Sequence, residues 1–260
     1  MVFLCVDIGA TNTLIGLGND EFEVLDRQKT KTFLKGIEAE LLQTLEKSSH
    51  TKKEVEKIAV AAAGPIDRES EFFHPPNVSE ESGMEEIDLG SPLRKLGELT
   101  IMNDCAAAAI GEHRYGKNPK EDMVYITISS GIGAGVIMNG ELVEGWKGNF
   151  AEIGHINTGS EGLKCGCGAR DHWEAYSSGN NLPKMAEKLF DAEFSDAKQV
   201  FEEAEKGDRK AEKTIRKMQE INARGVADTV NVYNPQKIVL GGALPLNHAQ
   251  TVVEPLKQDI

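Results

Sequence analysis

Apolar runs separated by turn residues predict strands in the first quarter of the chain. A glycine-containing turn and a Gly18-Asn-Asp turn separate the first three of these runs. A fourth run, Ile58–Ala63, is wholly apolar and stops at Gly64-Pro65. Before it, Gly36–Glu46 places leucines and an isoleucine at helical spacing, which predicts an amphipathic helix. The first three predicted strands are Val2–Val6, Thr13–Leu17 and Glu21–Asp26.

Strands and helices alternate through the rest of the chain. A strand predicted at Leu99–Met102 leads into the alanine-rich segment Cys105–His113, which predicts a helix. Residues 184–232 predict mostly helix, in which the charged stretch Glu202–Lys217 forms a solvated face. A last buried strand is predicted at Ile238–Leu240, and the alternation as a whole indicates an α/β fold.

One plan, strand, glycine turn, strand, turn, strand, occurs twice in the sequence. The first copy covers Val2–Thr30, with its glycine turn at Asp7–Thr11. The second copy covers Val124–Gly145, with its glycine turn at Ser130–Gly135 and the hairpin pair Asn139-Gly140 between its last two strands. Two such units predict two homologous domains that face a common cleft. The predicted domains are residues 1–110 and residues 111–260.

Composition and charge narrow the classes of partner. The chain has 260 residues, long enough for one large domain or two smaller ones, and a formal net charge of −13. The acidic excess is scattered, which argues against nucleic acid and anionic membranes as partners. No apolar run approaches the roughly 20 residues that cross a bilayer. The apolar start is interrupted by Asp7 and has no basic leader, so we expect a cytoplasmic protein with reduced or metal-bound cysteines.

Glycine turns suit phosphate binding, because without a Cβ the backbone N–H groups can converge on an anion. Two such turns in matching positions of a repeat favour the phosphates of one nucleotide, although each turn alone is equally consistent with a plain sharp hairpin. Beside the first turn, a carboxylate can orient the waters of Mg²⁺ and a hydroxyl can donate to phosphate. The nucleotide-binding candidates at the two turns are Asp7, Gly9, Thr11, Asn12, Ser130, Gly131, Gly133 and Gly135.

Three further motifs follow the glycine turns in a fixed order. They are Asn103-Asp104-Cys-Ala-Ala, Glu152-Ile-Gly-His155 and the run Cys165–Glu174. With the glycine turns, they resemble the motifs of the ROK family of sugar kinases and related repressors, over nearly the whole chain. The resemblance implies the actin/hexokinase/Hsp70 ATPase fold: two duplicated ribonuclease H-like α/β domains around a central cleft. It also implies a homodimer, as relatives are commonly dimers.

The resemblance implies a kinase that transfers the γ-phosphoryl group of ATP·Mg²⁺ to a sugar hydroxyl, with the 6-hydroxyl of glucose as the expected acceptor. Asp104 lies between a predicted strand and a predicted helix, where open α/β sheets bind ligands, and is the expected proton acceptor. The alternative is that Asp104 caps the helix. Gly241-Gly242 resembles the turn that contacts adenosine. The expected sugar-binding residues are Gly64, Asn77, Asn103, Glu152, His155 and Glu174, and for Asn77 a plain turn residue is equally consistent.

The cysteines suggest a metal site. Cys165-x-Cys167, with His172 five residues later and His155 ten residues earlier, offers two sulfur and two nitrogen donors, which suit tetrahedral Zn²⁺. A free thiol pair is the alternative. The family motif has Gly-Cys where this chain has Asp171-His172, so a histidine replaces its third cysteine. The expected role is structural: zinc holds the loop so that His155 and Glu174 meet the sugar.

Several alternatives stay open on the sequence. Nothing in it selects the group at C2 of the sugar, so kinases for N-acetylmannosamine, N-acetylglucosamine or fructose remain. A sugar-responsive repressor of the family has an additional N-terminal DNA-binding domain, and here the first predicted strand begins at residue 2. A non-catalytic sugar-binding protein also remains, because the chain ends at Ile260, soon after Gly241-Gly242, and we expect a truncated C-terminus relative to the family.

Overall fold

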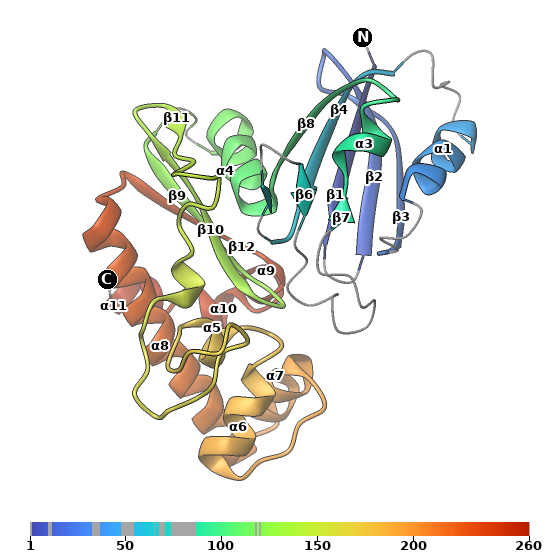
Figure 1. The fold of residues 1–260 in the computed structure, drawn as a ribbon. Coiled ribbons are helices and arrows are strands. Elements are labelled where there is room, and N and C mark those ends of the chain that lie inside the picture. Colours follow the sequence, from blue (N-terminus) through green and yellow to red (C-terminus); the bar gives the residue numbers. More distant parts are fainter. Residues whose placement is uncertain are drawn as a thin grey trace. The chain divides into compact units, whose positions relative to one another are not determined.

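The computed structural model describes residues 2–9, 12–32, 37–47, 55–64, 66–67, 71–73, 87–117, 119 and 121–259. The chain divides into two compact units (Figure 1). Unit 1 is residues 1–107 together with residues 144–150, and unit 2 is residues 108–143 together with residues 151–260. Among the helices that the structure describes, none is long and apolar enough to cross a bilayer.

Unit 1 is built on a five-stranded sheet with strand order β3-β2-β1-β4-β8. Strands β1, β2 and β3 form an antiparallel meander, and β4 and β8 run parallel to β1. The parallel strands therefore end at one edge of the sheet. The strand bounds are β1 Val2–Ile8, β2 Asn12–Asn19, β3 Val24–Lys31, β4 Val55–Ala62 and β8 Glu98–Asn103.

Alternation along β1 places one side of this sheet in the core of unit 1. Leu4, Val6 and Ile8 are buried, whereas the intervening Cys5 and Asp7 point away from that core. Helix α1 adds Leu41 to the same core. The smaller elements of unit 1 are α1 Ile37–Lys47, β5 Ile66–Asp67, β6 Phe72–Phe73, β7 Ile87–Asp88 and α3 Gly90–Leu93.

Two local contacts shape unit 1 in ways that the apolar pattern does not predict. β3 begins at Val24, so the strand predicted at Glu21–Asp26 is wrong in its start. The Asn19 side chain accepts from the N–H groups of Glu21 and Glu23, at 3.1 and 2.9 Å, which holds these residues in a turn. Asn149, from the segment 144–150, accepts from Ile66 N–H at 3.4 Å and so ties that segment to unit 1.

Unit 2 repeats the same plan in a four-stranded sheet with order β11-β10-β9-β12. Strands β9, β10 and β11 form an antiparallel meander, and β12 runs parallel to β9. The repeated strand plan predicted from the sequence is confirmed by these two topologies. The bounds are β9 Met123–Ile128, β10 Ile132–Met138, β11 Glu141–Leu142 and β12 Lys237–Gly241.

Helices complete unit 2. Helix α8 begins after Asp208, whose carboxylate accepts from two backbone N–H groups, and ends at Asn234 in the left-handed conformation. Helices α6 and α7 pack against α8 (Figure 1). The Trp173 ring packs on α8 at Gly225, where a Cβ would lie 2.3 Å from it, and its Nε1–H donates to Asn222 at 2.8 Å. Helix α4, Asp104–Tyr115, begins in unit 1 and continues into unit 2. The other helices of unit 2 are η2 Ile153–His155, α5 Glu174–Ser177, α6 Leu182–Phe190, α7 Ala197–Glu205, α8 Arg209–Tyr233, α9 Ala243–Asn247, α10 Ala249–Val252 and α11 Leu256–Asp259.

Candidate functional site

The carboxyl ends of the parallel strands in unit 1 bring several predicted site residues to one edge. Ile8 at the end of β1 lies opposite Ala62 of β4, and Ala62 lies opposite Asn103 of β8. The residues just beyond these ends include Gly64 and Asp104. This edge is the place where open α/β sheets bind ligands. The predicted position of Asp104, between a strand and a helix, is confirmed.

Asn103 caps helix α4 and ties it to the neighbouring strand. Its Oδ1 accepts from the N–H groups of Cys105 and Ala106, at 2.8 and 3.3 Å, and its Nδ2 donates to Gly64 O at 3.4 Å. Asp104 Oδ1 accepts from Cys105 N–H at 2.8 Å. The capping that was the alternative for Asp104 is thus supplied chiefly by Asn103.

The electrostatics of this edge favour a proton acceptor. Burial raises the pKa of the Asp104 carboxyl above its ordinary value, and the negative charge of Asp7 raises it further, against hydrogen bonds from Cys105 that lower it. Desolvation also raises the pKa of Asp7. A carboxylate with a raised pKa is a stronger base than a solvated one, so Asp104 is suited to accept a proton.

The first glycine turn, residues 9–12, is named turn 1. Gly9 N–H donates to Asn12 O at 3.0 Å, and a Cβ on Gly9 would lie 3.0 Å from that oxygen. The Thr32 hydroxyl, beyond the end of β3, donates to Gly9 O at 2.7 Å. No motif in the sequence indicates Thr32, which lies in a polar segment. Two predicted site residues, Thr11 of this turn and Asn77, lie outside the described residues.

The second glycine turn, residues 129–132, is named turn 2 and is shorter than predicted. Ser129 N–H donates to Gly131 O at 2.8 Å, which closes the turn, and Ser130 lies at its tip. Gly133 and Gly135 are strand residues, because they pair with Thr127 and Tyr125 of β9 in the sheet. The prediction that Gly133 and Gly135 belong to the turn is therefore wrong.

Turn 2 is contacted by two of the predicted sugar motifs. Ile132 N–H donates to Glu174 Oε2 at 2.9 Å. A Cβ on Gly131 would lie 2.7 Å from the same carboxylate oxygen, and a Cβ on Gly154 would lie 2.2 Å from Ile132 O. At residue 154 the neighbouring atom belongs to the backbone, so glycine is required there, whereas a side chain at residue 131 would displace the Glu174 carboxylate.

The unit 2 residues predicted to bind sugar lie near one another. Glu152 Oε2 is 3.9 Å from His155 Nε2 across the turn of η2. Desolvation raises the pKa of the Glu152 carboxyl, the charge of His155 lowers it, and the charge of Glu174 raises it. Ala151, just before Glu152, is buried and has φ of +62°, a conformation that favours glycine. Carboxylates and an imidazole this close together suit adjacent hydroxyls.

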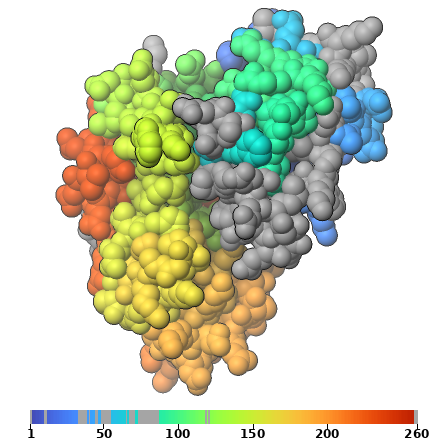
Figure 2. All heavy atoms as spheres, viewed as in Figure 1, coloured from blue at the N-terminus to red at the C-terminus, as the bar shows by residue number. Residues whose placement is uncertain are grey.

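The four predicted metal ligands form one cluster. Cys165 Sγ lies 3.5 Å from His155 Nδ1, and Cys167 Sγ lies 3.3 Å from His172 Nδ1. One ligand atom from each of the four residues lies within 4.8 Å of all the others. The loop that includes the two cysteines, yellow in Figure 2, is part of the surface of unit 2.

Asp171 holds this loop in place, a role that the sequence did not predict. Its backbone has φ of +63°, and its Oδ1 accepts from Gly162 N–H at 2.7 Å and from the Tyr176 hydroxyl. Its N–H donates to Leu163 O at 2.9 Å. The phenol oxygen of Tyr176 in turn accepts from Glu161 N–H at 3.1 Å. Both sides of the loop are thus fixed next to His172.

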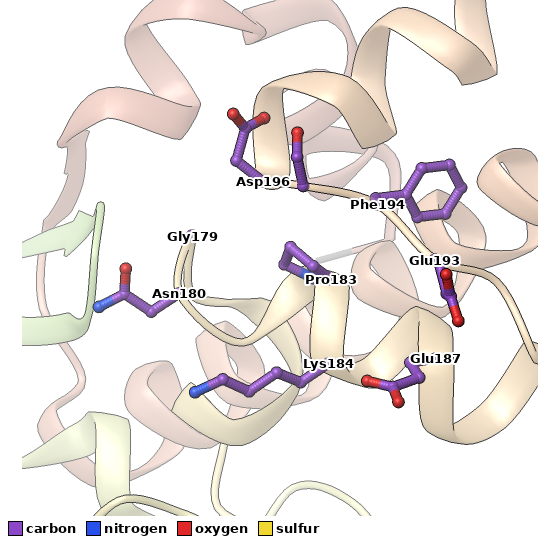
Figure 3. Close-up of a pocket in the computed structure, with 9 residues that line it drawn as sticks. Gly179, Asn180, Pro183, Lys184, Glu187, Glu193, Phe194 and Asp196 are labelled. Atoms are coloured by element: carbon purple, nitrogen blue, oxygen red, sulfur yellow. The ribbon is translucent and has the colours of Figure 1, made fainter.

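A cavity of about 410 Å³ lies beside turn 2. It is lined by Gly179 and Asn180, by Lys184 on α6, and by Asp196, the residue before α7 (Figure 3). Gly179 N–H donates to Ser129 O at 2.7 Å, so a residue that lines the cavity contacts the start of turn 2. Its lining is mixed, since Pro183 and Phe194 are apolar and Lys184 and Asp196 are charged, and its volume lies in the range of small-ligand sites.

Gly241-Gly242 lies at the end of the unit 2 sheet where turn 2 also lies. Gly241 ends β12 opposite Thr127, near the end of the parallel strand β9. Gly242 has φ of +87°, and a Cβ there would lie 2.6 Å from Ile128 O, so glycine is required. This turn, turn 2 and the cavity therefore share one end of the sheet.

Comparison with known proteins identifies the relatives of this chain. The ROK family model matches residues 3–260. A glucokinase of Aeropyrum pernix is 30% identical, in an alignment that covers 97% of this chain and 85% of that protein. An N-acetylmannosamine kinase of Escherichia fergusonii is 30% identical over 250 residues, which cover 95% and 84%.

Solved structures agree with the sequence relatives. A ROK hexokinase from Thermus thermophilus has a TM-score of 0.82 at 26% identity, covering 100% of this chain and 89% of that one. A ROK family glucokinase from Streptomyces griseus, solved with glucose and AMPPNP, has a TM-score of 0.80 at 27% identity, covering 100% and 88%. The expected class, sugar kinases of the actin/hexokinase-type fold, is confirmed. The chain belongs to the ROK family.

Proposed function

We propose that this protein is an ATP-dependent hexose kinase that transfers the γ-phosphoryl group to the 6-hydroxyl of glucose. The observation that carries the proposal is Asp104, half-buried at the carboxyl edge of the unit 1 sheet and with a raised pKa. Such a carboxylate can take the proton of a sugar hydroxyl as the phosphoryl group is transferred. Asn103 supplies most of the helix cap and positions the start of α4.

Turn 1 and turn 2 are proposed to bind the phosphates of ATP through backbone N–H groups. The residues assigned to this role are Gly9, Thr11, Asn12, Ser130 and Gly131. Asp7 would orient the waters of Mg²⁺, and the bound ion would neutralise charge on the phosphates. The cavity beside turn 2 has a volume in the range of small-ligand sites, so we assign the adenosine to it and to the Gly241-Gly242 turn.

We propose that the sugar binds chiefly through the Glu152–His155 motif and through Glu174, the last residue of the run Cys165–Glu174. Glu152, His155 and Glu174 would offer carboxylates and an imidazole to the hydroxyl groups. Gly64 would join Asn103, to which it is hydrogen-bonded and which precedes Asp104, the proposed proton acceptor. Asn77 keeps its predicted role on the sequence alone. The arrangement of these groups on one hexose, and the common cleft expected from the repeat, stay predictions.

The Cys/His cluster is proposed to hold a structural zinc ion. Ligand atoms around tetrahedral Zn²⁺ lie roughly 3.3–3.8 Å apart, as its bond lengths require. The two sulfur–nitrogen distances in the cluster, 3.5 and 3.3 Å, fit that geometry. The ion would stabilise the loop, and with His155 Nδ1 as its ligand the Nε2 atom remains for the sugar. Metal analysis of the purified protein is expected to give one zinc ion per chain; a metal-free protein with full activity would contradict it.

The sugar that this protein prefers is tested by a panel of hexoses. Coupled measurement of ADP formation is expected to give the highest kcat/KM for glucose, with lower values for N-acetylmannosamine, N-acetylglucosamine and fructose. The second candidate, N-acetylmannosamine, is favoured by the curated kinase relatives at 30% identity. A higher kcat/KM for N-acetylmannosamine would replace glucose, and no turnover with any sugar would refute the kinase.

A homodimer is proposed on the family resemblance alone, and a cytoplasmic location on the cysteines, which we expect to be reduced or metal-bound. Relatives of the family are commonly dimers. Sedimentation of the purified chain is expected to give about twice the mass of the 28.3 kDa chain. A species of single-chain mass at micromolar concentration would contradict the dimer.

A further inference from the structure

We propose that Glu174 is a positioning residue for turn 2, so that the sugar-binding motif sets the conformation of a nucleotide-binding turn. The inference rests on the proposed function, since it takes turn 2 as a phosphate-binding element. Its observation is a hydrogen bond of 2.9 Å from Ile132 N–H to Glu174 Oε2. The protein's own carboxylate thus binds a backbone N–H group that ends this turn.

Two residues of the predicted sugar motifs, Glu174 and Gly154, lie very close to turn 2. Glu174 is the first residue of α5, and its carboxylate reaches so near the turn that a Cβ on Gly131 would lie 2.7 Å from Oε2. The Glu152–His155 motif reaches the turn through Gly154, whose Cβ would lie 2.2 Å from Ile132 O. The two glycines make both approaches possible.

On the side of the cavity, the same turn is held by backbone hydrogen bonds. Gly179 N–H donates to Ser129 O at 2.7 Å, and Asn180 N–H donates to Ser130 O at 3.3 Å. Gly179 and Asn180 also line the cavity assigned to the adenosine. Turn 2 therefore contacts the sugar motif on one side and, on the other, two residues that line the cavity.

Glu174 is also hydrogen-bonded to a residue at the start of α6, the helix that lines part of the cavity. The Asn181 side chain donates from Nδ2 to Glu174 O at 3.1 Å and to Ser178 Oγ at 2.9 Å. Asn181 precedes α6, the helix that contributes Lys184 to the cavity. One residue thus contacts turn 2 through its side chain and the start of α6 through its backbone.

The chemistry of the contact explains why a carboxylate suits this role. A hydrogen bond from a backbone N–H to a charged acceptor is stronger than one to a neutral acceptor. It fixes the direction of the Ile132 peptide before a nucleotide arrives, which lowers the ordering cost of binding. A sugar that orients Glu174 would in this way also affect nucleotide affinity, and the coupling would be reciprocal.

The test measures nucleotide binding without sugar, so that loss of sugar contacts does not enter. Calorimetric titration with AMPPNP and Mg²⁺ compares the wild type with Glu174→Gln and Glu174→Met. These two variants have the same charge and nearly the same length, but only glutamine can accept from Ile132 N–H. We expect Glu174→Gln to bind AMPPNP at least about five-fold more tightly than Glu174→Met, the factor that one hydrogen bond supplies.

Two controls separate positioning from other effects. Glu152→Gln alters the other predicted sugar carboxylate and is expected to weaken glucose binding while AMPPNP binding without sugar is unchanged. Unfolding by heat is expected to give similar midpoints for the Gln and Met variants, which excludes a global loss of structure.

Each outcome decides the inference. Suppose that the wild-type protein phosphorylates a sugar, but Glu174→Gln and Glu174→Met bind AMPPNP with equal affinity. This result overturns the positioning role and leaves the proposed function intact. Failure of the wild type to bind AMPPNP at all overturns the inference together with the nucleotide site of the proposed function. A five-fold or larger difference supports it whichever hexose proves to be the substrate.

Discussion

Turn 1 and turn 2 occupy matching places in two similar sheets, yet different groups hold them. Turn 1 is closed by the Gly9 to Asn12 backbone bond and fixed by the Thr32 hydroxyl. Turn 2 is fixed by a carboxylate, Glu174, and by the close approach of Gly154. The repeated strand plan thus determines where a glycine turn lies, and the segments added around it determine what it is connected to.

The same contrast holds for the chemistry of the two units. Unit 1 places Asp104 and Asp7 near each other at the carboxyl edge of its sheet, where burial raises both pKa values. Unit 2 gathers the acidic and histidine residues predicted to recognise a sugar and the cluster suited to zinc. Under the proposed function, unit 1 supplies the proton acceptor and unit 2 supplies most of the sugar recognition.

The largest effect is expected from removing the base in unit 1. Asp104→Asn keeps the size of the side chain but cannot accept the proton, so kcat is expected to fall roughly 10²- to 10⁴-fold. Glucose affinity, measured by calorimetry, is expected to stay within about two-fold of wild type, because unit 2 supplies most of the recognition. Turnover like that of the wild type would show that Asp104 is not the proton acceptor.

The pH dependence of activity tests the pair of carboxylates in unit 1. The carboxylate form of Asp104 is the active one, so kcat/KM is expected to fall about ten-fold per pH unit below its pKa. This acid limb of the pH–activity profile should lie at a higher pH than an ordinary aspartate would give, since burial and the charge of Asp7 raise the pKa of Asp104. In Asp7→Asn, which lowers the rate, the limb of the residual activity is expected to move to lower pH. A limb that stays in place would exclude the coupling.

A pair of glycine substitutions compares how tightly the two turns are packed. Gly154→Ala would place a Cβ 2.2 Å from the backbone oxygen of Ile132, so the free energy of unfolding is expected to fall by on the order of 1–3 kcal/mol. Gly9→Ala places its Cβ 3.0 Å from Asn12 O, and a loss below about 1 kcal/mol is expected. Urea unfolding measures both. Equal losses would contradict the tighter packing of turn 2.

The smallest effect is expected at Ala151, beside the sugar motif of unit 2. Because Ala151 has φ of +62°, Ala151→Gly is expected to raise the free energy of unfolding by about 1 kcal/mol. The matched control is Ala223→Gly inside helix α8, which is expected to lower stability by about 1 kcal/mol. A loss of stability in both variants would show that Ala151 is not strained.

Much of the fold could be predicted from the sequence, because the apolar runs and the Asn139-Gly140 hairpin pair mark the repeated strands. The start of β3 could not be, because it depends on hydrogen bonds that the Asn19 side chain accepts from the N–H groups of Glu21 and Glu23. The sequence also predicts Gly133 and Gly135 to be part of turn 2, because a glycine in a turn cannot be distinguished by sequence from a glycine paired in a strand.

The candidate site was predicted residue by residue where a motif is local in sequence. Cys165, Cys167 and His172 are an example, and His155 joins them from ten residues away. Contacts between distant segments could not be predicted. The bond from Ile132 to Glu174 joins residues 42 apart, and Asp171 was noted only as a departure from a motif. The cavity could not be predicted either, because its lining comes from two separate segments, between residues 179 and 187 and between residues 193 and 196, whose packing no motif indicates.

Phosphorus NMR of the wild-type protein with ATP, Mg²⁺ and glucose tests the central claim most directly. The account predicts that ADP and one sugar phosphomonoester appear in equal amounts, at the 6-position of glucose, and that ATP stays intact when the sugar is omitted. Inorganic phosphate as the main product, or unchanged ATP with glucose and every other hexose of the panel, would contradict a sugar kinase.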